Sequence, residues 1–288
     1  RLTAIACSPR QACVLNANGG LTCWGDLSGT SPPMSGYTSI VNGGNVSGIT
    51  SDGEVLTWGV TYPNCPAGQD CLADLPGPHQ AAFSAFRPQR FYLDELGQVT
   101  SSRDNWTGDY PPYEGALPDA RPKDTFSTLA VGPFICGLHA DGTFLCWSDT
   151  GIGSDSAPLD DGTHTYALLD QADGLCGITR EDGSIVRISG STYDGPTGKG
   201  YRAIVTYTQT PPGDARRCGL TADGDLDCSA SPYEQMVPAG AQLDKVCSGR
   251  SYVCGIRFDG KVSCWGREEG NFSDDPLILH IPDEIRAP

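Results

Sequence analysis

One hairpin-like stretch recurs along the whole chain and constrains its fold more than any other feature. Its clearest copy is residues 253–266, in which two short apolar runs flank Asp259-Gly260. Asp-Gly between apolar runs is a strong hairpin signal, because glycine adopts positive φ at little cost. Seven copies align on a turn glycine at intervals of 34, 44, 45, 41, 41 and 36 residues: Gly19, Gly53, Gly97, Gly142, Gly183, Gly224 and Gly260.

This period predicts an all-β fold, a seven-bladed β-propeller. Repeats of about 40 residues with several strands each are typical of propellers. The 28 residues after Gly260 and the 19 residues up to Gly19 make one more repeat. We therefore expect the N- and C-termini to close the ring, with a strand candidate at 277–281 joining residues 1–5 in the first blade. Because one blade cannot bury both its faces, residues 1–288 are expected to form a single domain.

Paired cysteines mark the repeated hairpins. In four copies a cysteine stands six residues before the turn glycine and another four residues after it. Both are absent together in the second and third copies, as expected for residues opposed on neighbouring strands. The spacing is too wide for a zinc site, and no histidine accompanies the pairs. We predict four hairpin disulfides, each contributing about 3 kcal/mol in the chain-entropy model: Cys13–Cys23, Cys136–Cys146, Cys218–Cys228 and Cys254–Cys264.

The other five of the thirteen cysteines have separate interpretations. Cys65 and Cys71 flank a five-residue segment and are expected to staple one loop. Cys7 and Cys247 are interpreted as the same repeat position in the first and seventh copies, so a bond between them is expected to lock the ring. Cys176 has no partner in its hairpin and is interpreted as a buried small hydrophobe rather than a nucleophile. Such disulfide use indicates an oxidising compartment.

Charge and hydropathy limit the classes of partner. The formal net charge is −16 and the pI is about 4.4. That acidity opposes non-specific nucleic-acid binding, which depends on neutralising phosphates with Lys and Arg. No apolar run has transmembrane length, and no signal peptide is recognisable. We therefore interpret the chain as a mature secreted protein, extracellular or periplasmic, without membrane insertion.

The repeats carry a family resemblance. Residues 237–249, followed by the hairpin and Cys264-Trp265-Gly266, resemble one repeat of the chromosome-condensation-regulator superfamily. The short repeats are most similar to those of propellers of the secreted beta-lactamase inhibitor protein II type, and the Cys-Trp-Gly ending is similar to the ectodomain of plant crinkly-type receptor kinases. The resemblance covers the whole chain and implies a propeller that binds a protein. It identifies no contact residue, and the acidity of the chain opposes a chromatin role.

Tryptophan positions separate packing from candidate binding. Four tryptophans directly follow the second cross-strand position and are expected to pack between blades: Trp24, Trp58, Trp147 and Trp265. Trp106 is outside this register, in a long stretch at 105–122 that is rich in aromatics and prolines. Long connections on a rigid scaffold often bind ligands, so Trp106 is a candidate. The alternative is that these rings cover the outer edge of the third blade.

Six arginines gather in the turns between the first and second strands of the repeats. The superfamily resemblance places these turns at one rim of the ring. An arginine-rich rim on an acidic body would attract anionic ligands, and Arg binds carboxylate, sulfate or phosphate through paired hydrogen bonds. The alternative is that each Arg pairs with a local acid or faces water. The candidate ligand-binding residues here are Arg10, Arg87, Arg90, Arg216, Arg217, Arg250 and the adjacent Tyr252.

Catalytic and metal motifs are sparse. The four histidines share no repeat position, and no nucleophile elbow, zinc-binding helix or phosphate loop is present. Residues 223–227 resemble half a calcium loop but straddle a hairpin turn, so no metal or cofactor is expected. The first hypothesis is a secreted, monomeric recognition module that binds an extracellular protein, such as an enzyme that it inhibits. The alternatives are a lectin for acidic glycans and a polysaccharide lyase or glycoside hydrolase on the same face.

Overall fold

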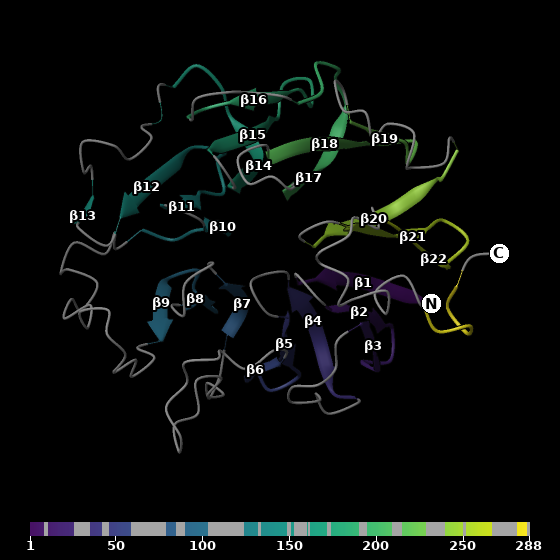
Figure 1. The fold of residues 1–288 in the computed structure, drawn as a ribbon. Helices are drawn as coiled ribbons and strands as arrows, with labels where there is room; N and C mark the ends of the chain where they lie inside the picture. Colours follow the sequence, from purple (N-terminus) through teal and green to yellow (C-terminus); the bar gives the residue numbers. More distant parts are fainter. Residues whose placement is uncertain are drawn as a thin grey trace, which may run out of the picture.

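A computed structural model shows that the regular elements of the described residues are all β-strands, in seven antiparallel sheets. Figure 1 shows these sheets following one another around a common centre. The all-β prediction is confirmed. The described residues are 1–8, 11–25, 35–41, 46–58, 79–84, 90–102, 124–131, 134–148, 151–152, 160, 162–171, 174–189, 195–208, 215–228, 240–249, 252–266 and 281–286.

Each sheet consists of consecutive strands, the fourth of four strands and the others of three. We number the sheets in chain order and call the boundary between two neighbours a seam. The first three sheets are β1 (Leu2–Cys7), β2 (Gln11–Asn16), β3 (Leu21–Gly25); β4 (Tyr37–Val41), β5 (Val46–Thr50), β6 (Val55–Trp58); and β7 (His79–Ser84), β8 (Arg90–Asp94), β9 (Val99–Ser102). The others are β10 (Thr128–Val131), β11 (Ile135–Leu138), β12 (Phe144–Ser148), β13 (Gly151–Ile152); β14 (Tyr166–Gln171), β15 (Leu175–Thr179), β16 (Ile185–Arg187); β17 (Tyr201–Thr208), β18 (Ala215–Thr221), β19 (Leu226–Asp227); and β20 (Leu243–Ser248), β21 (Tyr252–Arg257), β22 (Val262–Gly266).

The repeated hairpins form the second and third strands of the sheets. All seven turn glycines have positive φ, between 70° and 95°. Cys13 lies opposite Cys23 and Cys254 lies opposite Cys264, as the spacing predicts. In the fifth sheet, Cys176 lies opposite Arg187. The sequence pattern therefore specified both the turn and the register of these hairpins.

Turn glycines also join neighbouring sheets. In the described residues, the carbonyl oxygens of five turn glycines accept hydrogen bonds from a backbone amide at or just before the first strand of the following sheet, for example Gly97 from Phe126 and Gly142 from Tyr166, both at 2.8 Å. A side chain on Gly97 would meet the Phe126 carbonyl oxygen at 2.6 Å, so only glycine fits this close approach. One end of the sheets is therefore bound together by a repeated backbone contact.

Buried tryptophans fill the seams. Trp58 of the second sheet shares a cluster with Leu15 of the first, and Trp147 of the fourth with Phe91 of the third. Trp24 of the first sheet belongs to a cluster with residues of the seventh. Each ring therefore packs toward the preceding sheet, as expected for packing residues.

The first and seventh sheets are joined covalently by Cys7–Cys247, with their Cα atoms 5.5 Å apart. The premise that these cysteines share a repeat position is wrong: Cys7 lies opposite Ala12, whereas Cys247 lies opposite Cys254, one register step away. Successive side chains of a strand point to opposite faces. Because of the one-step difference, the two sulfurs face each other across the seam, whereas equivalent residues would face the same way around the ring.

The expected strand at 277–281 lies outside the described residues except for Ile281, and the residues that follow it contact both the seventh and the first sheet. Arg286 forms a parallel bridge with Val262 of β22, in the seventh sheet. Ile281 is buried in a cluster with Ile5 and Val14 of the first sheet. Residues 281–286 thus contact the seventh sheet through Arg286 and pack on the first through Ile281.

Candidate functional site

Most of the candidate ligand residues lie in or beside the segments that join the first and second strands of the sheets. These segments are at the end of each sheet away from the hairpin turn. Arg90 and Arg216 belong to β8 and β18. Arg217 and Tyr252 are the two whose side chains can be placed. Outside the described residues lie Arg10, Arg87, Trp106 and Arg250, together with the expected Cys65–Cys71 staple.

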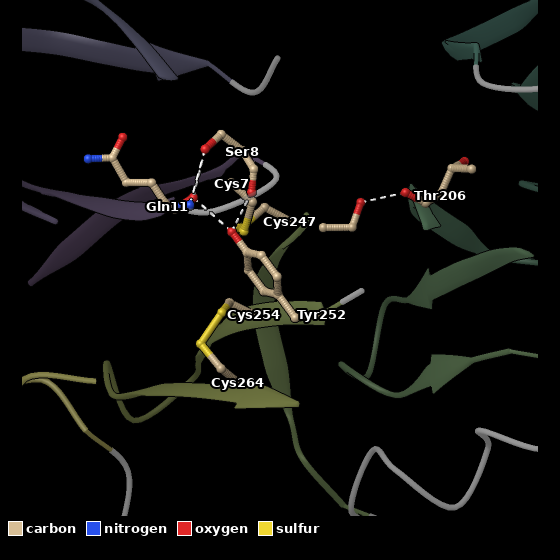
Figure 2. The surroundings of a disulfide bond; sticks show 9 residues. Cys7, Ser8, Gln11, Thr206, Cys247, Tyr252, Cys254 and Cys264 are labelled. Atoms are coloured by element: carbon tan, nitrogen blue, oxygen red, sulfur yellow. Dashed lines mark hydrogen bonds between the residues drawn. A yellow bond between two sulfur atoms is a disulfide. The ribbon is translucent and has the colours of Figure 1, made fainter. Parts of the chain in front are cut away.

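Tyr252 is a seam residue. Its side chain is buried, with 3% exposed, and its hydroxyl lies 2.7 Å from the carbonyl oxygens of both Ser8 and Gln11 in the first sheet. Figure 2 shows this ring beside the Cys7–Cys247 bond. The expectation that Tyr252 faces a ligand is wrong in this structure, because its hydroxyl is used to hold the turn between β1 and β2.

Arg217 has a similar place between the fifth and sixth sheets. It is also 3% exposed, and its Nη2 donates to the carbonyl oxygen of Gly174 at 3.0 Å. The expectation of direct ligand contact is therefore wrong for Arg217 as well. Both side chains therefore hydrogen-bond to residues that flank a turn of the neighbouring sheet and help to hold that turn in place.

Further cross-seam bonds run along the innermost strands. Ser248 Oγ of β20 donates to the carbonyl oxygen of Thr206 in β17 at 2.6 Å, and Thr206 Oγ1 donates to Asp170 Oδ2 in β14 at 2.5 Å. In the seam between the fourth and fifth sheets, the side-chain amide of Gln171 bonds to the backbone of Phe134: its nitrogen donates to the Phe134 carbonyl oxygen at 2.8 Å and its oxygen accepts from the Phe134 amide at 3.1 Å. Sequence reasoning missed these residues. The available signal was a polar residue such as Asp170 where the matching strand positions hold Ala130 or Val205.

The fifth seam, between the fifth and sixth sheets, contains ionisable groups: Asp170 is partly buried, and Arg217 and Cys176 are buried. Burial raises the pKa of Asp170, while the hydrogen bond from Thr206 and the charge of Arg217 partly offset that rise. Cys176 is fully buried and unbonded, and burial raises the pKa of its thiol to about 11. A thiol with this pKa is protonated at neutral pH and a poor nucleophile. The interpretation of Cys176 as a buried small side chain agrees with this environment.

The described side chains at this end of the sheets act through hydrogen bonds to neighbouring sheets. Among the described residues, no group of three or more His, Cys, Asp or Glu side chains is placed to hold a metal ion. Asp227, in the segment resembling half a calcium loop, accepts a hydrogen bond from the Tyr201 hydroxyl. At this end of the sheets, the described residues beside the turns are therefore held by hydrogen bonds to the neighbouring sheet.

Comparisons with known proteins bear on the fold. No protein-family profile matches the chain, and no curated sequence matches it. The ectodomain of the Arabidopsis thaliana receptor kinase ACR4, described as a CRINKLY WD40 ectodomain, has a TM-score of 0.64 at 16% identity, with 92% of this chain and 95% of that chain covered. The entire ectodomain of the Physcomitrella patens receptor kinase CR4 has a TM-score of 0.60 at 19% identity, covering 92% and 74%. Yeast RCC1 (Prp20) in complex with Kap60 matches at a TM-score of 0.42 and 12% identity, covering 92% and 70%, too distant to carry an argument.

These similarities identify the fold. The chain has a β-propeller repeat fold, with sheets stapled by disulfides of the predicted pairing: Cys13–Cys23, Cys136–Cys146, Cys218–Cys228 and Cys254–Cys264. Extensive disulfide bonding fits an extracellular location. Within the described residues, no helix is long and apolar enough to span a membrane.

Proposed function

We propose that the chain is a single-domain, closed, seven-bladed propeller that acts outside the cytoplasm as a protein-binding module. The binding face is the end of the sheets away from the hairpin turns. One observation carries this choice: the two longest connections between sheets, 59–78 and 103–127, follow β6 and β9 and leave from that end. Variable connections on a rigid scaffold commonly carry binding function.

The opposite end is less suited to a specific partner. Its turns are short and similar, and in the described residues five of the seven turn-glycine carbonyls are already bonded to the next sheet. Receptor-kinase ectodomains are among the similar structures, which supports an extracellular recognition role. An enzyme target, as in inhibitors of the beta-lactamase inhibitor protein II type, is one form of this proposal.

A lectin for acidic glycans is the second candidate, because arginines gather in the turns of this face. The buried Arg217 leaves the surface set, so this candidate depends on Arg10, Arg87, Arg90, Arg216 and Arg250. A lyase or hydrolase would need titratable groups that converge on the same face. Asp170, which lies near it, is bonded to Thr206 within a seam.

Paired variants test the choice of face. One replaces residues 104–121 by a Gly-Ser linker of equal length, and a control replaces the exposed turn carboxylates Asp182 and Asp223 by Ala at the other end. Partners are selected with the intact protein from extracellular proteins and from a glycan array with sulfated and uronic-acid polymers, at low and moderate salt. Loss of binding only in the linker variant supports the proposal, and loss only in the control contradicts it. Salt-sensitive binding to acidic glycans alone would favour the lectin.

A further inference from the structure

The seam between the seventh and first sheets and the fifth seam each contain a contact between the same two register positions, but the residues at these positions differ. Cys247 and Asp170 occupy the same register position of their inner strands, and Cys7 and Thr206 occupy the position that meets them across the seam. Between the seventh and first sheets the slot holds a disulfide. In the fifth seam it holds the hydrogen bond from Thr206 to a carboxylate. The equivalent contact is therefore a covalent bond in one seam and a hydrogen bond to an ionisable carboxyl group in the other.

The fifth seam also buries a guanidinium with incomplete hydrogen bonding. Nε of Arg217 is buried without a hydrogen-bond partner. At the equivalent register position, directly before the first cross-strand position, other sheets bury apolar side chains: Ala12, Val46, Ile135, Leu175 and Val253. Burying ionic groups without full pairing opposes closure of a seam, whereas apolar burial favours it.

The charged and titratable groups facing Asp170 come from three strands of the described chain. They are Arg217 of β18, Cys176 of β15 and, beside that thiol, Arg187 of β16. Strands β10 and β11 of the neighbouring fourth sheet carry no charged residue. Burial raises the pKa of the Cys176 thiol to about 11, so this thiol stays neutral at neutral and acidic pH, whereas Asp170, whose pKa is raised above 3.8, gains a proton as the pH falls.

We propose that the fifth seam opens locally while the rest of the ring stays folded, and that the ionised carboxylate of Asp170 promotes this opening. When the seam opens, water hydrates the Asp170 carboxyl group. This hydration stabilises the ionised form much more than the protonated form, so ionisation lowers the free energy of opening. The fifth seam also has an apolar cluster, formed by Cys176, Ile178, Ile185 and Tyr201, but beside it lie the Asp170 carboxylate and the incompletely bonded guanidinium of Arg217. This inference goes beyond the binding function and does not depend on it.

The direction of the pH dependence follows from the raised pKa of Asp170 in the closed seam. The closed form binds a proton more tightly than the open form, whose carboxyl has its ordinary value of 3.8. Lowering the pH from neutral toward that value therefore favours closure. Below it both forms are protonated, and no further change is expected.

Cys176 provides a built-in reporter, because it is a free thiol buried in this seam. The native protein is labelled with 4,4′-dithiodipyridine from pH 7 to pH 4, and each rate is divided by that of the urea-unfolded, disulfide-intact protein at the same pH. We expect the normalised labelling rate to be at least about tenfold higher than the fraction of globally unfolded protein would give, because local opening needs less free energy than global unfolding. The normalised rate is expected to fall as the pH falls.

Asp170→Asn separates the carboxylate charge from the hydrogen bond, because Asn still accepts from Thr206. Its normalised labelling at pH 7 is expected to be slower than that of the wild type by about tenfold or more, and to converge with the wild type near pH 4. Asp223→Asn, at an exposed hairpin turn, is the matched control and should label as the wild type does. Labelling no faster than global unfolding, or an unchanged or faster rate in Asp170→Asn at pH 7, overturns the proposal. If Asp170→Asn does not fold, the wild-type pH profile decides, and a normalised rate that is flat or rises toward pH 4 overturns it.

Discussion

Ser47 and Thr57 occupy in the second sheet the positions that hold a disulfide in four other sheets, and their hydroxyl oxygens lie 2.8 Å apart. Both side chains are buried. A hydrogen bond thus takes the place of the covalent bond at the same cross-strand slot. The hairpin keeps its register without cysteines, because the turn and the apolar flanks already define it.

The double variant Ser47→Cys/Thr57→Cys is therefore expected to form a new disulfide. The four natural hairpin bonds join Cα atoms 4.0–4.2 Å apart, and the same strand pairing exists here. Closing an eleven-residue loop contributes about 3 kcal/mol, and losing the hydrogen bond costs about 1 kcal/mol. A net gain of about 2 kcal/mol should appear in urea unfolding. Mass spectrometry after alkylation without reduction should show no added free thiol, while Ser47→Cys alone should show one and no gain; two alkylated thiols in the native double variant would contradict the expectation.

Gln242 is the one described non-glycine residue with positive φ, at 48°. It directly precedes the first strand of its sheet, as Gly36 and Gly200 do in theirs, and those glycines have φ of 100° and 76°. Left-handed backbone costs a residue with a side chain about 1–2 kcal/mol. Gln242→Gly should therefore raise the free energy of unfolding by about 1 kcal/mol in a urea titration.

The matched control for that change is Gln98→Gly, since Gln98 is also exposed but is not in the left-handed region. There the substitution only adds freedom to the unfolded chain, so it should lower stability by about 0.5–1 kcal/mol. Equal effects of the two substitutions would show that strain at Gln242 is absent.

Sequence reasoning specified the hairpins in detail; across the seams it predicted the Cys7–Cys247 bond and the packing of the tryptophans but not the register or the polar contacts, for a physical reason. Within a hairpin, the turn residues and the two-residue period of strands fix which side chains meet, so Cys254 and Cys264 could be paired by counting. Across a seam, the partners come from strands far apart in the chain, and their facing depends on single-residue register. Cys7 is 12 residues before its turn glycine and Cys247 is 13 before its own, and that difference was the missed signal.

Burial of charged residues was the other feature that local pattern could not reveal. Arg217 belongs to an arginine-rich set in sequence, yet its guanidinium lies in a seam and bonds to Gly174. A hint existed, because most repeats have an apolar residue at that position. The binding face itself remains a proposal, since it rests on connections outside the described residues.

Carboxylates in the hairpin turns make the free energy of unfolding depend on pH in the acidic range. The pKa of Asp141 is lowered by the hydrogen bonds that it accepts from the backbone amide and then the hydroxyl of Thr143. A carboxyl with a lowered folded pKa contributes stability above its unfolded pKa, about 3.9, and loses it as the pH falls through the folded value. Asp141→Asn should therefore be less stable than the wild type at pH 7 in urea unfolding, and the difference should shrink below about pH 4.

The neighbouring substitution Thr143→Ala tests the cause, because it removes the hydroxyl donor and leaves the backbone bond. Its pH profile should fall between those of the wild type and Asp141→Asn. A constant difference between wild type and Asp141→Asn from pH 7 to pH 3 would mean that the turn geometry, and not the charge, is what the carboxylate supplies.

Tyr252→Phe is expected to weaken the junction between the seventh and first sheets. The substitution keeps the ring in its buried place but leaves the carbonyl oxygens of Ser8 and Gln11 without the hydroxyl donor. The Gln11 carbonyl oxygen still accepts from the Ser8 backbone amide at 2.8 Å, so the main cost is the loss of the hydroxyl donor at the Ser8 carbonyl, and an unsatisfied buried polar group costs about 1–3 kcal/mol. Hydrogen exchange should become faster at the amides of β1 and β20, while the hairpins on the far side of the ring stay protected.

The disulfide beside Tyr252 allows the two supports of this junction to be separated. Replacing Cys7 and Cys247 by Ser removes the covalent link, and adding Tyr252→Phe to that variant removes the hydrogen bonds as well. Neighbouring contacts that support one structure couple in double-mutant cycles, typically by 0.5–3 kcal/mol. We expect the combined loss of stability to differ from the sum of the separate losses by about 1 kcal/mol. Strict additivity, with exchange at β1 unchanged in Tyr252→Phe, would mean that the hydroxyl holds only the local turn and does not support closure of the ring.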